Sequence, residues 1–502
     1  MKPGRPAKRL DLPGCFVSLS IGQDTCDSLM KEGARCCFLP FPFCFSFLPI
    51  VLILYFGPLR RCRNLVLLLA SLFFYFSGEP RFFLVMVGAT CSGWLHGFWI
   101  NAWRGRKHAR IPLISSICFS LAPLLLFKYA DFFLTAVNGF TGWQIPLLKL
   151  TLPLGISFYT FQILSYSIDL YRGKAGLQKS FWRFLTYVSF FPQLIAGPIV
   201  RYTQVEKELT ARTHTLEQFS NGMQRFLIGL GKKVLIANLM GEIVSTFSKA
   251  NEKTVLFYWL YAIAYTLQIY FDFSSYSDMA IGLGAMFGFR FPENFQYPYV
   301  SVSITEFWRR WHMTLSLWFR DYVYIPLGGN RVSLIKQIRN LLVVWILTGF
   351  WHGASWNFLL WGLYFGVLLI GEKFLYGKLL EKLPNFFRHV YTMLAVVIGF
   401  VLFNAANLRE AWECIRAMFG FGHVPVVNAE TMYTLRSNAG VLLMAVIGAT
   451  PLCRSLWMRL RSIGKWERVL NAAEPVFLAG ILCVVTAFLI NGSFNPFLYF
   501  RF

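Results

Sequence analysis

Residues 341–371 read LLVVWILTGFWHGASWNFLLWGLYFGVLLIG, and no Asp, Glu, Lys or Arg occurs between Arg339 and Glu372. A helix of about 20 apolar residues crosses the hydrocarbon core of a bilayer, so this run predicts a membrane-embedded segment. His352 is the only imidazole in the run and has apolar residues on both sides, which predicts a position well inside the bilayer. Because an ionisable side chain there is costly, His352 is the first candidate functional residue.

The rest of the chain has the same apolar character. It is 56% hydrophobic, 14% of its residues are charged, and its mean hydropathy is +0.51, whereas charged residues make up about a quarter of a soluble protein. Further apolar runs occur at 38–56, 82–100, 111–127, 255–271, 391–403 with its flanks, and 475–490. The sequence therefore predicts an all-α integral membrane protein, a single multi-helix bundle with roughly 10–12 transmembrane helices.

Basic residues give the chain a formal net charge of +24 and gather between the apolar runs. The clusters are Arg60, Arg61 and Arg63; Arg104, Arg106, Lys107 and Arg110; and Arg454, Arg459, Arg461, Lys465 and Arg468. Cytoplasmic loops of membrane proteins collect Lys and Arg, so the clusters mark the cytoplasmic side and no nucleic-acid partner is predicted. Residues 64–102 have room for two spans that turn at 78–80, which places the first two clusters on one side.

The cysteines and the N-terminal residues indicate no site of their own. The 11 cysteines show no C-x-x-C spacing, so neither a zinc site nor a disulfide framework is predicted. Residues 1–37 are polar and basic, unlike a signal peptide, because the apolar run starts too late. We therefore interpret 1–37 as an extension of unknown role and 38–502 as the membrane domain.

A second distinctive stretch is SITEFWRRWHMTLSLWFRDYVYIPLGGNR, residues 303–331. Ser303 and Glu306 match a capping box, and Pro326 followed by two glycines predicts the helix end. One helical face carries Trp308, Trp311, His312, Leu315, Phe319 and Tyr322, and its flank carries Arg309, Ser316 and Arg320. Glu306 can pair with Arg310 one turn later. The stretch predicts an amphipathic helix, either at the membrane surface with its basic face toward lipid headgroups or lining a cavity.

The two histidines limit the possible chemistry. A metal site needs three or four ligands, and no third ligand is visible nearby, so no metal is predicted. A serine hydrolase would need a G-x-S-x-G elbow, and none stands out. Acyl transfer from a thioester fits, because imidazole can take the proton of an attacking hydroxyl and the thioester supplies its own leaving group. The alternative for His352 is a neutral side chain that is hydrogen-bonded between helices.

Several stretches resemble the membrane-bound O-acyltransferase family, and within it the bacterial alginate O-acetyltransferase branch. They are LPLGISFYTFQILSYSIDLYRG (152–173), FFPQLIAGPIVRY (190–202), FDFSSYSDMAIGLGAMFGFRFPENFQYPY (271–299), the whole of 303–331, and GFWHGASWNFLLWG (349–362). The resemblance implies a helical bundle around a central tunnel. It also implies that His352 stands at the family's invariant histidine and His312 at the branch's second catalytic histidine.

The resemblance also implies substrates and partners. Relatives acetylate alginate, cellulose or peptidoglycan from the bacterial cytoplasmic membrane, usually with an extracytoplasmic partner transferase, and acetyl-CoA is the expected donor. A more distant cousin, the teichoic acid D-alanylation protein, takes its acyl group from a carrier-protein thioester. Arg309, Arg310, Arg320 and Arg331 are candidates to contact donor phosphates, because arginine binds phosphate with two hydrogen bonds. The alternative for each arginine is the ordinary cytoplasmic excess of basic residues.

The C-terminal residues, FNPFLYFRF (494–502), are unusually aromatic for a chain end. One span follows the last basic cluster, so this tail is predicted on the outer face. Phe497, Tyr499, Phe500 and Phe502 could anchor it in the interface or plug the outer mouth of the tunnel. The tail resembles an F-x-Y-F motif of cell-surface acylation systems, which implies that the Tyr499 hydroxyl carries the acetyl group as a transient ester.

Two other functions remain open from the sequence. In a membrane transporter the histidines would form a proton relay, but no clear inverted repeat and few intramembrane carboxylates are found. A scaffold for a polysaccharide synthesis complex would need no catalytic residue. Acyl transfer by purified protein separates an enzyme from both alternatives.

Overall fold

The computed structural model describes residues 42–491, 497 and 498, and within them the chain is helical and contains no strand. The N-terminal half contains α3 (Leu48–Phe56), α4 (Arg63–Gly78), α5 (Phe83–Trp103), α6 (Arg110–Leu124), α7 (Ala130–Thr141), α8 (Ile156–Tyr171), α9 (Phe181–Ser189), α10 (Tyr202–Thr210), α11 (Leu216–Lys232), α12 (Asn238–Lys249) and α13 (Val255–Met286). The C-terminal half contains α14 (Ile304–Arg310), α15 (Met313–Phe319), α16 (Leu334–His352), α17 (Trp356–Gly371), α18 (Gly377–Glu381), α19 (Asn385–Asn404), α20 (Leu408–Met418), α21 (Ala429–Gly448), α22 (Leu452–Arg461) and α23 (Gly464–Ile490).

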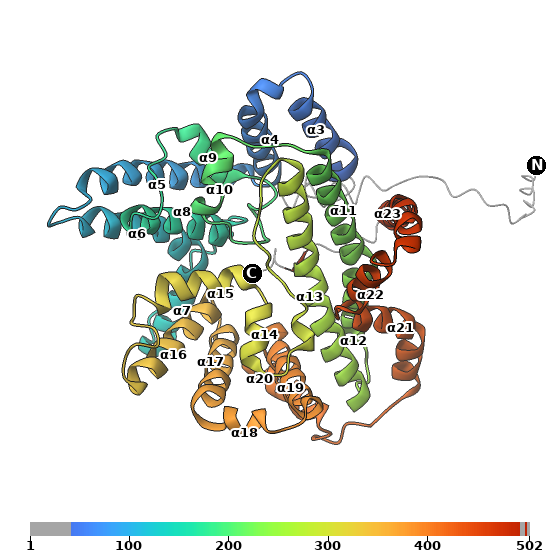
Figure 1. Cartoon of the computed structure of the whole chain (residues 1–502). Helices are drawn as coiled ribbons and strands as arrows, with labels where there is room; N and C mark the ends of the chain where they lie inside the picture. Colours follow the sequence, from blue (N-terminus) through green and yellow to red (C-terminus); the bar gives the residue numbers. More distant parts are fainter. Residues whose placement is uncertain (1–41, 492–496, 499–502) are drawn as a thin grey trace, which may run out of the picture.

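The longest helix, α13, lies at the centre of the molecule and packs closely against α11 (Figure 1). Glycines make this approach possible, since a Cβ atom added at Gly222 would lie 2.7 Å from the Gly282 carbonyl oxygen. Close backbone contact through small residues is the usual way in which membrane helices associate. α13 therefore forms a buried axis around which the other helices are arranged.

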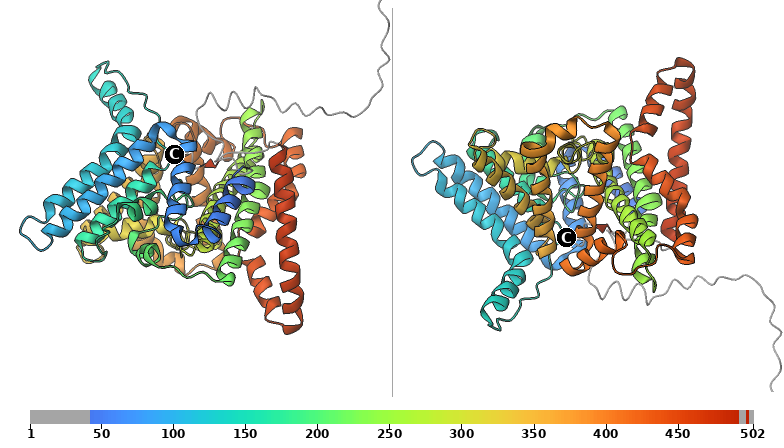
Figure 2. Two further views of the ribbon diagram at one scale, coloured as in Figure 1. Left: turned by 90° about the horizontal axis from the view of Figure 1, so that it is seen from above. Right: turned by 90° about the horizontal axis from the view of Figure 1, so that it is seen from below.

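The outer helices present apolar side chains to their surroundings. α5 and α6 extend from one edge of the molecule, and α22 and α23 form the opposite edge (Figure 2). On α23, the side chains of Val476 and Phe477 are 72% and 63% exposed. An exposed apolar surface of this kind is expected where lipid rather than water is the solvent.

Fewer membrane crossings are identified than the sequence predicts. Within the described residues, six helices are long and apolar enough to span a bilayer, or eight if two bent helix pairs each count as one span. The prediction was roughly 10–12 spans. α13 is long enough but carries Asp272 and Asp278, which lower its hydropathy. The predicted turn at 78–80 is confirmed, because α4 ends at Gly78 and α5 begins at Phe83.

The apolar run 341–371 is not one crossing. It is divided between α16, which ends at His352, and α17, which begins at Trp356, and the two helices pack against each other. A Cβ atom added at Gly349 would lie 2.3 Å from the Phe358 carbonyl oxygen and 3.2 Å from the Gly362 Cα atom. His352 therefore lies at the end of a helix, beside the turn of a helical hairpin, and its predicted depth in the bilayer stays a prediction.

Candidate active site

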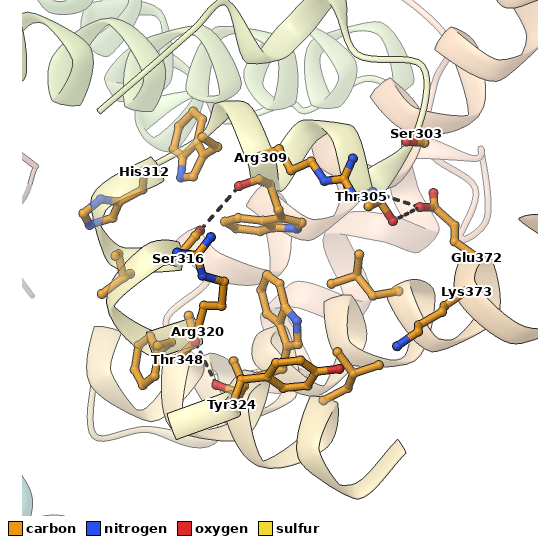
Figure 3. Close-up of a pocket in the computed structure, with 18 of the residues that line it drawn as sticks. Ser303, Thr305, Arg309, His312, Ser316, Arg320, Tyr324, Thr348, Glu372 and Lys373 are labelled. Carbon is orange, nitrogen blue, oxygen red and sulfur yellow. Dashed lines mark hydrogen bonds between the residues drawn. The ribbon is translucent and has the colours of Figure 1, made fainter. Parts of the chain in front are cut away.

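A cavity of about 630 Å³ contains both candidate histidines in its wall. Its walls come from α14 to α19 and from the segments that follow α15 and α17 (Figure 3). The polar and charged side chains that line it are Ser303, Thr305, Arg309, His312, Ser316, Arg320, Tyr324, Asn330, Thr348, His352, Glu372, Lys373, Glu381 and Arg388. The size is that of a typical small-molecule site. The structure thus brings together residues that the sequence separates by 40 positions.

His312 lies between two short helices, which corrects the single continuous helix predicted over 303–326. α14 ends at Arg310 and α15 starts at Met313, and His312 has the left-handed backbone angles φ 42° and ψ 53°. Such angles are unusual for a residue other than glycine and mark local strain. Backbone hydrogen bonds from the segment before α14 stabilise the break between α14 and α15. Gln296 N–H donates to the Arg310 carbonyl at 3.0 Å, and Met313 N–H donates to the Asn294 carbonyl at 2.9 Å.

The buried side chain of Asn294 fixes the tautomer of His312. Asn294 Oδ1 lies 3.0 Å from His312 Nδ1 and also accepts hydrogen bonds from the backbone N–H and the hydroxyl of Thr314. Asn294 Nδ2 donates to Ser277 Oγ at 2.9 Å, which settles the orientation of the amide. Because Oδ1 can only accept, His312 Nδ1 carries the proton and Nε2 carries the lone pair. Asn294 was not predicted as a site residue, because it stands 18 residues before His312 and has no local signal.

The start of α14 confirms part of the predicted capping box. Ser303 Oγ accepts the N–H of Glu306 at 3.0 Å, and the Glu306–Arg310 ion pair forms at 2.8 Å. The Glu306 carboxylate accepts the N–H of Val302 at 2.9 Å. Glu372 adds a second cap that was not predicted, because its two oxygens accept the backbone N–H groups of Ile304 at 2.6 Å and Thr305 at 2.8 Å. A carboxylate at a helix N-terminus satisfies unpaired donors and the helix dipole.

His352 is held by backbone contacts at the end of α16. The helix stops at Gly353, where the Phe358 ring occupies the place of a side chain. Two side chains from the π-helical segment Leu125–Tyr129 satisfy the last carbonyls of α16. Lys128 Nζ donates to the Trp351 carbonyl at 2.6 Å, and the Tyr129 hydroxyl donates to the Phe350 carbonyl at 2.8 Å. Lysine at a helix C-terminus is a favourable arrangement. Lys128 was not selected from the sequence, where it stands out as a lone cation directly after the apolar run 111–127.

Aromatic rings surround the His352 imidazole. The ring centroids of Trp351, Trp361 and Phe403 lie 4.9, 5.0 and 5.2 Å from its own, each with its plane turned by 75–83°. The Trp351 ring also lies 6.0 Å from the ring of His312 and so neighbours both histidines. His312 and His352 are 1% and 5% exposed. This wall excludes water from the part of the cavity in which the histidines lie.

The four candidate arginines divide into two pairs. Arg309 and Arg320 line the cavity (Figure 3), whereas Arg310 and Arg331 do not. Arg310 is held by Glu306, and the predicted donor-binding role of Arg310 and Arg331 gains no support from their positions. Lys373 and Arg388, which the sequence analysis did not select, also line the cavity. Within the described part of the chain Arg309 forms no ion pair, so its charge is available to a ligand.

Arg320 is positioned by an acidic neighbour. Asp321 bonds Arg320 Nε at 2.7 Å and Arg201 Nη1 at 2.8 Å. Burial by itself raises the pKa of Asp321, but hydrogen bonds from Arg320 and Arg201 outweigh it and hold the pKa below that of an ordinary aspartate. Arg201 belongs to the stretch 190–202, so this carboxylate joins two of the distinctive sequence stretches at the cavity.

The predicted acyl carrier Tyr499 lies outside the described residues. Its neighbours Phe497 and Leu498 are described, and both are buried, with 8% and 7% of their surface exposed. The Phe497 ring packs edge-on against Tyr276 of α13 at 5.2 Å. This part of the tail therefore lies against the protein interior, whereas an aromatic anchor in the membrane interface would have an exposed ring.

The described residues contain no group of three or more His, Cys, Asp or Glu side chains that could hold a metal ion. Two histidines alone do not make a zinc site, which needs at least three protein ligands. The groups that line the cavity and can take part in chemistry are the two imidazoles and the cations around them.

Comparison with known proteins identifies the family. A sequence profile of MBOAT, the membrane-bound O-acyltransferase family, matches residues 177–409. The probable alginate O-acetylase AlgI of Pseudomonas aeruginosa is 44% identical over 410 residues, which cover 81% of this chain and 79% of that protein. The chain belongs to the membrane-bound O-acyltransferase family. It is accordingly an acyltransferase and a multi-pass membrane protein.

Two further relatives extend the match over almost the whole chain. The probable alginate O-acetylase AlgI of Pseudomonas putida is 39% identical over 483 residues, covering 92% of this chain and 99% of that protein. The peptidoglycan O-acetyltransferase of Helicobacter pylori is 32% identical over 508 residues, covering 92% and 96%. The predicted all-α membrane fold and the alginate O-acetylase-like branch of the family are confirmed.

Proposed function

We propose that this acyltransferase takes an acetyl group from cytoplasmic acetyl-CoA and moves it through the bacterial cytoplasmic membrane for O-acetylation of an extracytoplasmic polysaccharide, completed by a partner transferase. One observation carries the proposal: the cavity that contains His312 and His352 is also lined by Arg309 and Arg320. A site with two imidazoles and several cations suits a donor that has both a thioester and phosphates. The names of the relatives, alginate O-acetylase and peptidoglycan O-acetyltransferase, support a cell-surface polysaccharide as the final acceptor.

The charges of the cavity support a phosphate-bearing donor. Four cations line it, namely Arg309, Arg320, Lys373 and Arg388, against the two acids Glu372 and Glu381. Glu372 is already committed to the start of α14. Coenzyme A carries several phosphate charges, and guanidinium groups bind phosphate oxygens with paired hydrogen bonds. We therefore assign Arg309 and Arg320 to donor binding and leave Arg310 and Arg331 out.

In the proposed reaction no metal takes part. The acceptor hydroxyl itself attacks the thioester, so no acyl-enzyme intermediate precedes it. An acceptor hydroxyl attacks the thioester carbonyl while His352 removes the hydroxyl proton as general base. The C–S bond breaks, a C–O ester bond forms, and the proton passes to the coenzyme A thiolate. His312 assists at the thioester in the tautomer that Asn294 selects, with the proton on Nδ1 and the lone pair on Nε2. The imidazoles thus begin and end the cycle neutral.

The immediate acceptor in this proposal is the hydroxyl of Tyr499. An aryl ester is a reactive carrier, so the acetyl group can be passed on to the partner transferase. Leu498, the residue before Tyr499 in the sequence, donates its N–H to Asp272 of α13, and the ring of the next α13 residue, Phe273, lies 4.6 Å from that of His312, which supports the choice. Residues 38–502 act as one domain in this scheme, and no role is assigned to 1–37.

The decisive experiment reconstitutes the purified protein in liposomes with acetyl-labelled acetyl-CoA. The parent protein is predicted to release coenzyme A and to carry label in its C-terminal peptide, and His352→Ala is predicted to do neither while it stays folded and inserted. His108→Ala, an exposed histidine far from the cavity, is the matched control. Near-normal transfer by His352→Ala would contradict the role of His352, and no transfer by the parent would contradict acetyl-CoA as the donor.

A second variant separates the acyl carrier from a simple anchor. Tyr499→Phe keeps the aromatic ring and removes the hydroxyl that would hold the ester. Polymer acetylation is predicted to be lost while acetyl-CoA binding persists. Acetylation at the parent rate would reduce Tyr499 to an anchor and leave the rest of the proposal intact.

A further inference from the structure

A buried ion pair between the end of α11 and the central helix α13 lies beside the C-terminal tail. Lys233, which follows α11, donates from Nζ to Asp272 Oδ1 of α13 at 2.5 Å. The two side chains are only 3% and 2% exposed. Removing two charges from solvent costs several kcal/mol for each ion, which their mutual attraction recovers only when further hydrogen bonds satisfy both groups. We therefore expect further contacts that satisfy both charged groups of this pair.

The additional partners of the pair both come from the tail. Asp272 Oδ2 accepts the backbone N–H of Leu498 at 2.7 Å. Lys233 Nζ lies 4.5 Å from the centre of the Phe497 ring, within the range of a cation–π interaction. Each charge thus contacts its counter-ion and one tail residue. A segment more than 220 positions away in the sequence completes the environment of the pair.

We propose that Lys233 and Asp272 form a latch that holds the C-terminal tail at Phe497 and Leu498 and so limits how far the next residue in the sequence, Tyr499, can reach. The proposal rests on the proposed function and names two positioning residues for it. Asp272 binds a backbone N–H, so it sets the register of the tail whatever the side chain at 498. A carrier hydroxyl has to reach the reacting thioester within a few tenths of an ångström, and fixing it one or two residues away serves that purpose.

A neighbouring pair on the same helices supplies a matched control. Lys232 donates to Asp278 of α13 at 2.8 Å, and Arg225 shares the same carboxylate at 2.9 Å. These side chains are 20–30% exposed, and among the described residues none of them contacts the tail. The two adjacent lysines therefore pair with two aspartates of one helix, but only the buried pair contacts Phe497 and Leu498.

The first test replaces the pair by apolar residues of similar size. Lys233→Met with Asp272→Leu leaves no unpaired buried charge, a type of change that proteins tolerate well. Leu498→Cys is added as a probe, and its reaction with a maleimide is followed by mass spectrometry of the C-terminal peptide. Loss of the latch is predicted to speed labelling by about tenfold or more, because one hydrogen bond to a charged group shifts the equilibrium between bound and released tail by about that factor. Lys232→Met with Asp278→Leu is predicted to leave labelling slow.

Unchanged labelling in the Lys233/Asp272 variant, or equal acceleration in the control, would overturn the latch. This readout does not involve acetyl transfer, so it is independent of the proposed function. If labelling accelerates but the parent protein transfers no acetyl group, the latch stands and the proposed function fails.

The second test leaves the ion pair intact, so it does not depend on how the first variant folds. Leu498→Pro removes the N–H that Asp272 accepts, and Leu498→Ala keeps it while shortening the side chain. Label in the C-terminal peptide is predicted to fall by roughly tenfold or more in the proline variant and by less in the alanine variant, with acetyl-CoA binding unchanged in both. Equal losses in the two variants would contradict a role for the backbone hydrogen bond.

Discussion

His352 ends a 19-residue apolar helix, whereas His312 stands between two seven-residue helices in a left-handed conformation. His352 is positioned by packing, through the contact of Gly349 with α17 and through Lys128 and Tyr129, which bond the last carbonyls of α16. His312 is positioned by hydrogen bonds from one segment, 294–296, which holds both its ring and the backbone on either side. One cavity thus contains a residue held by shape and a residue held by polar contacts.

The difference indicates which changes each histidine tolerates. A packed helix crossing responds to added volume, because cores of this density do not accommodate a methyl group without a shift. A strained backbone held by an amide responds to the loss of hydrogen bonds, because the strain persists only while its surroundings enforce it. The predictions below separate the two mechanisms.

The largest effect is expected from Gly349→Ala. The new Cβ would lie 2.3 Å from the Phe358 carbonyl oxygen, so α16 and α17 must move apart by about 1 Å to reach ordinary contact. A displacement of that size at a catalytic group costs about 100-fold in rate. Acetyl transfer and thermal unfolding of the purified protein are measured together. Gly440→Ala, on α21 with open space around its Cβ, is the control and is expected to keep full activity.

A smaller effect is expected from Asn294→Ala. The change removes the acceptor for His312 Nδ1–H and for the Thr314 N–H and hydroxyl, so kcat is predicted to fall by about 10- to 100-fold with KM for the donor little changed. Asn294→Asp keeps the oxygen and is expected to retain more activity than the alanine variant. Asn138→Ala, which removes a similar amide in the peripheral helix α7, should leave kcat unaltered. Equal kcat for parent and Asn294→Ala would show that the backbone alone holds His312.

The smallest effect is expected from Asp321→Asn, which weakens the hold on Arg320. The pKa of Asp321 lies below its ordinary value, so its contribution to stability is present above the ordinary aspartate pKa of about 3.9 and is lost as the pH falls through the lower value of the folded protein. Because the pair is partly exposed, the parent is predicted to exceed the variant by no more than about 1 kcal/mol at neutral pH. Thermal unfolding at pH 7 and at acid pH checks the sign, and a difference that grows on acidification would contradict it.

The fold class and His352 could be predicted because their signals are local. Apolar runs mark the helices that lipid requires, and an imidazole without charged neighbours is visible in one stretch. Gly353 and Ser355 also carried the signal that divides 341–371, since glycine ends helices and serine begins them. The apolar composition of that run outweighed the signal, so no helix break was predicted within it.

The break at His312 could not be predicted in the same way. The residues from Trp308 to Tyr322 have the spacing of one continuous helix. The contacts that break this helix come from Asn294 and Gln296, which lie before the predicted helix start. Nothing in the local pattern indicates that a loop pairs with the carbonyl of Arg310. The contribution of Glu372 to the start of α14 was hidden for the same reason, because 68 residues separate it from Ile304.

The central claim is that His312 and His352 act together on one donor in one cavity. The most direct measurement is the single-turnover rate of acetyl transfer from labelled acetyl-CoA in the parent, His312→Ala, His352→Ala and the double variant. Residues that act as a unit show strongly non-additive losses. We predict that each single change costs about 100-fold or more and that the double change costs little beyond the larger of the two. A near-normal rate in either single variant, or losses that multiply in the double variant, would contradict the account.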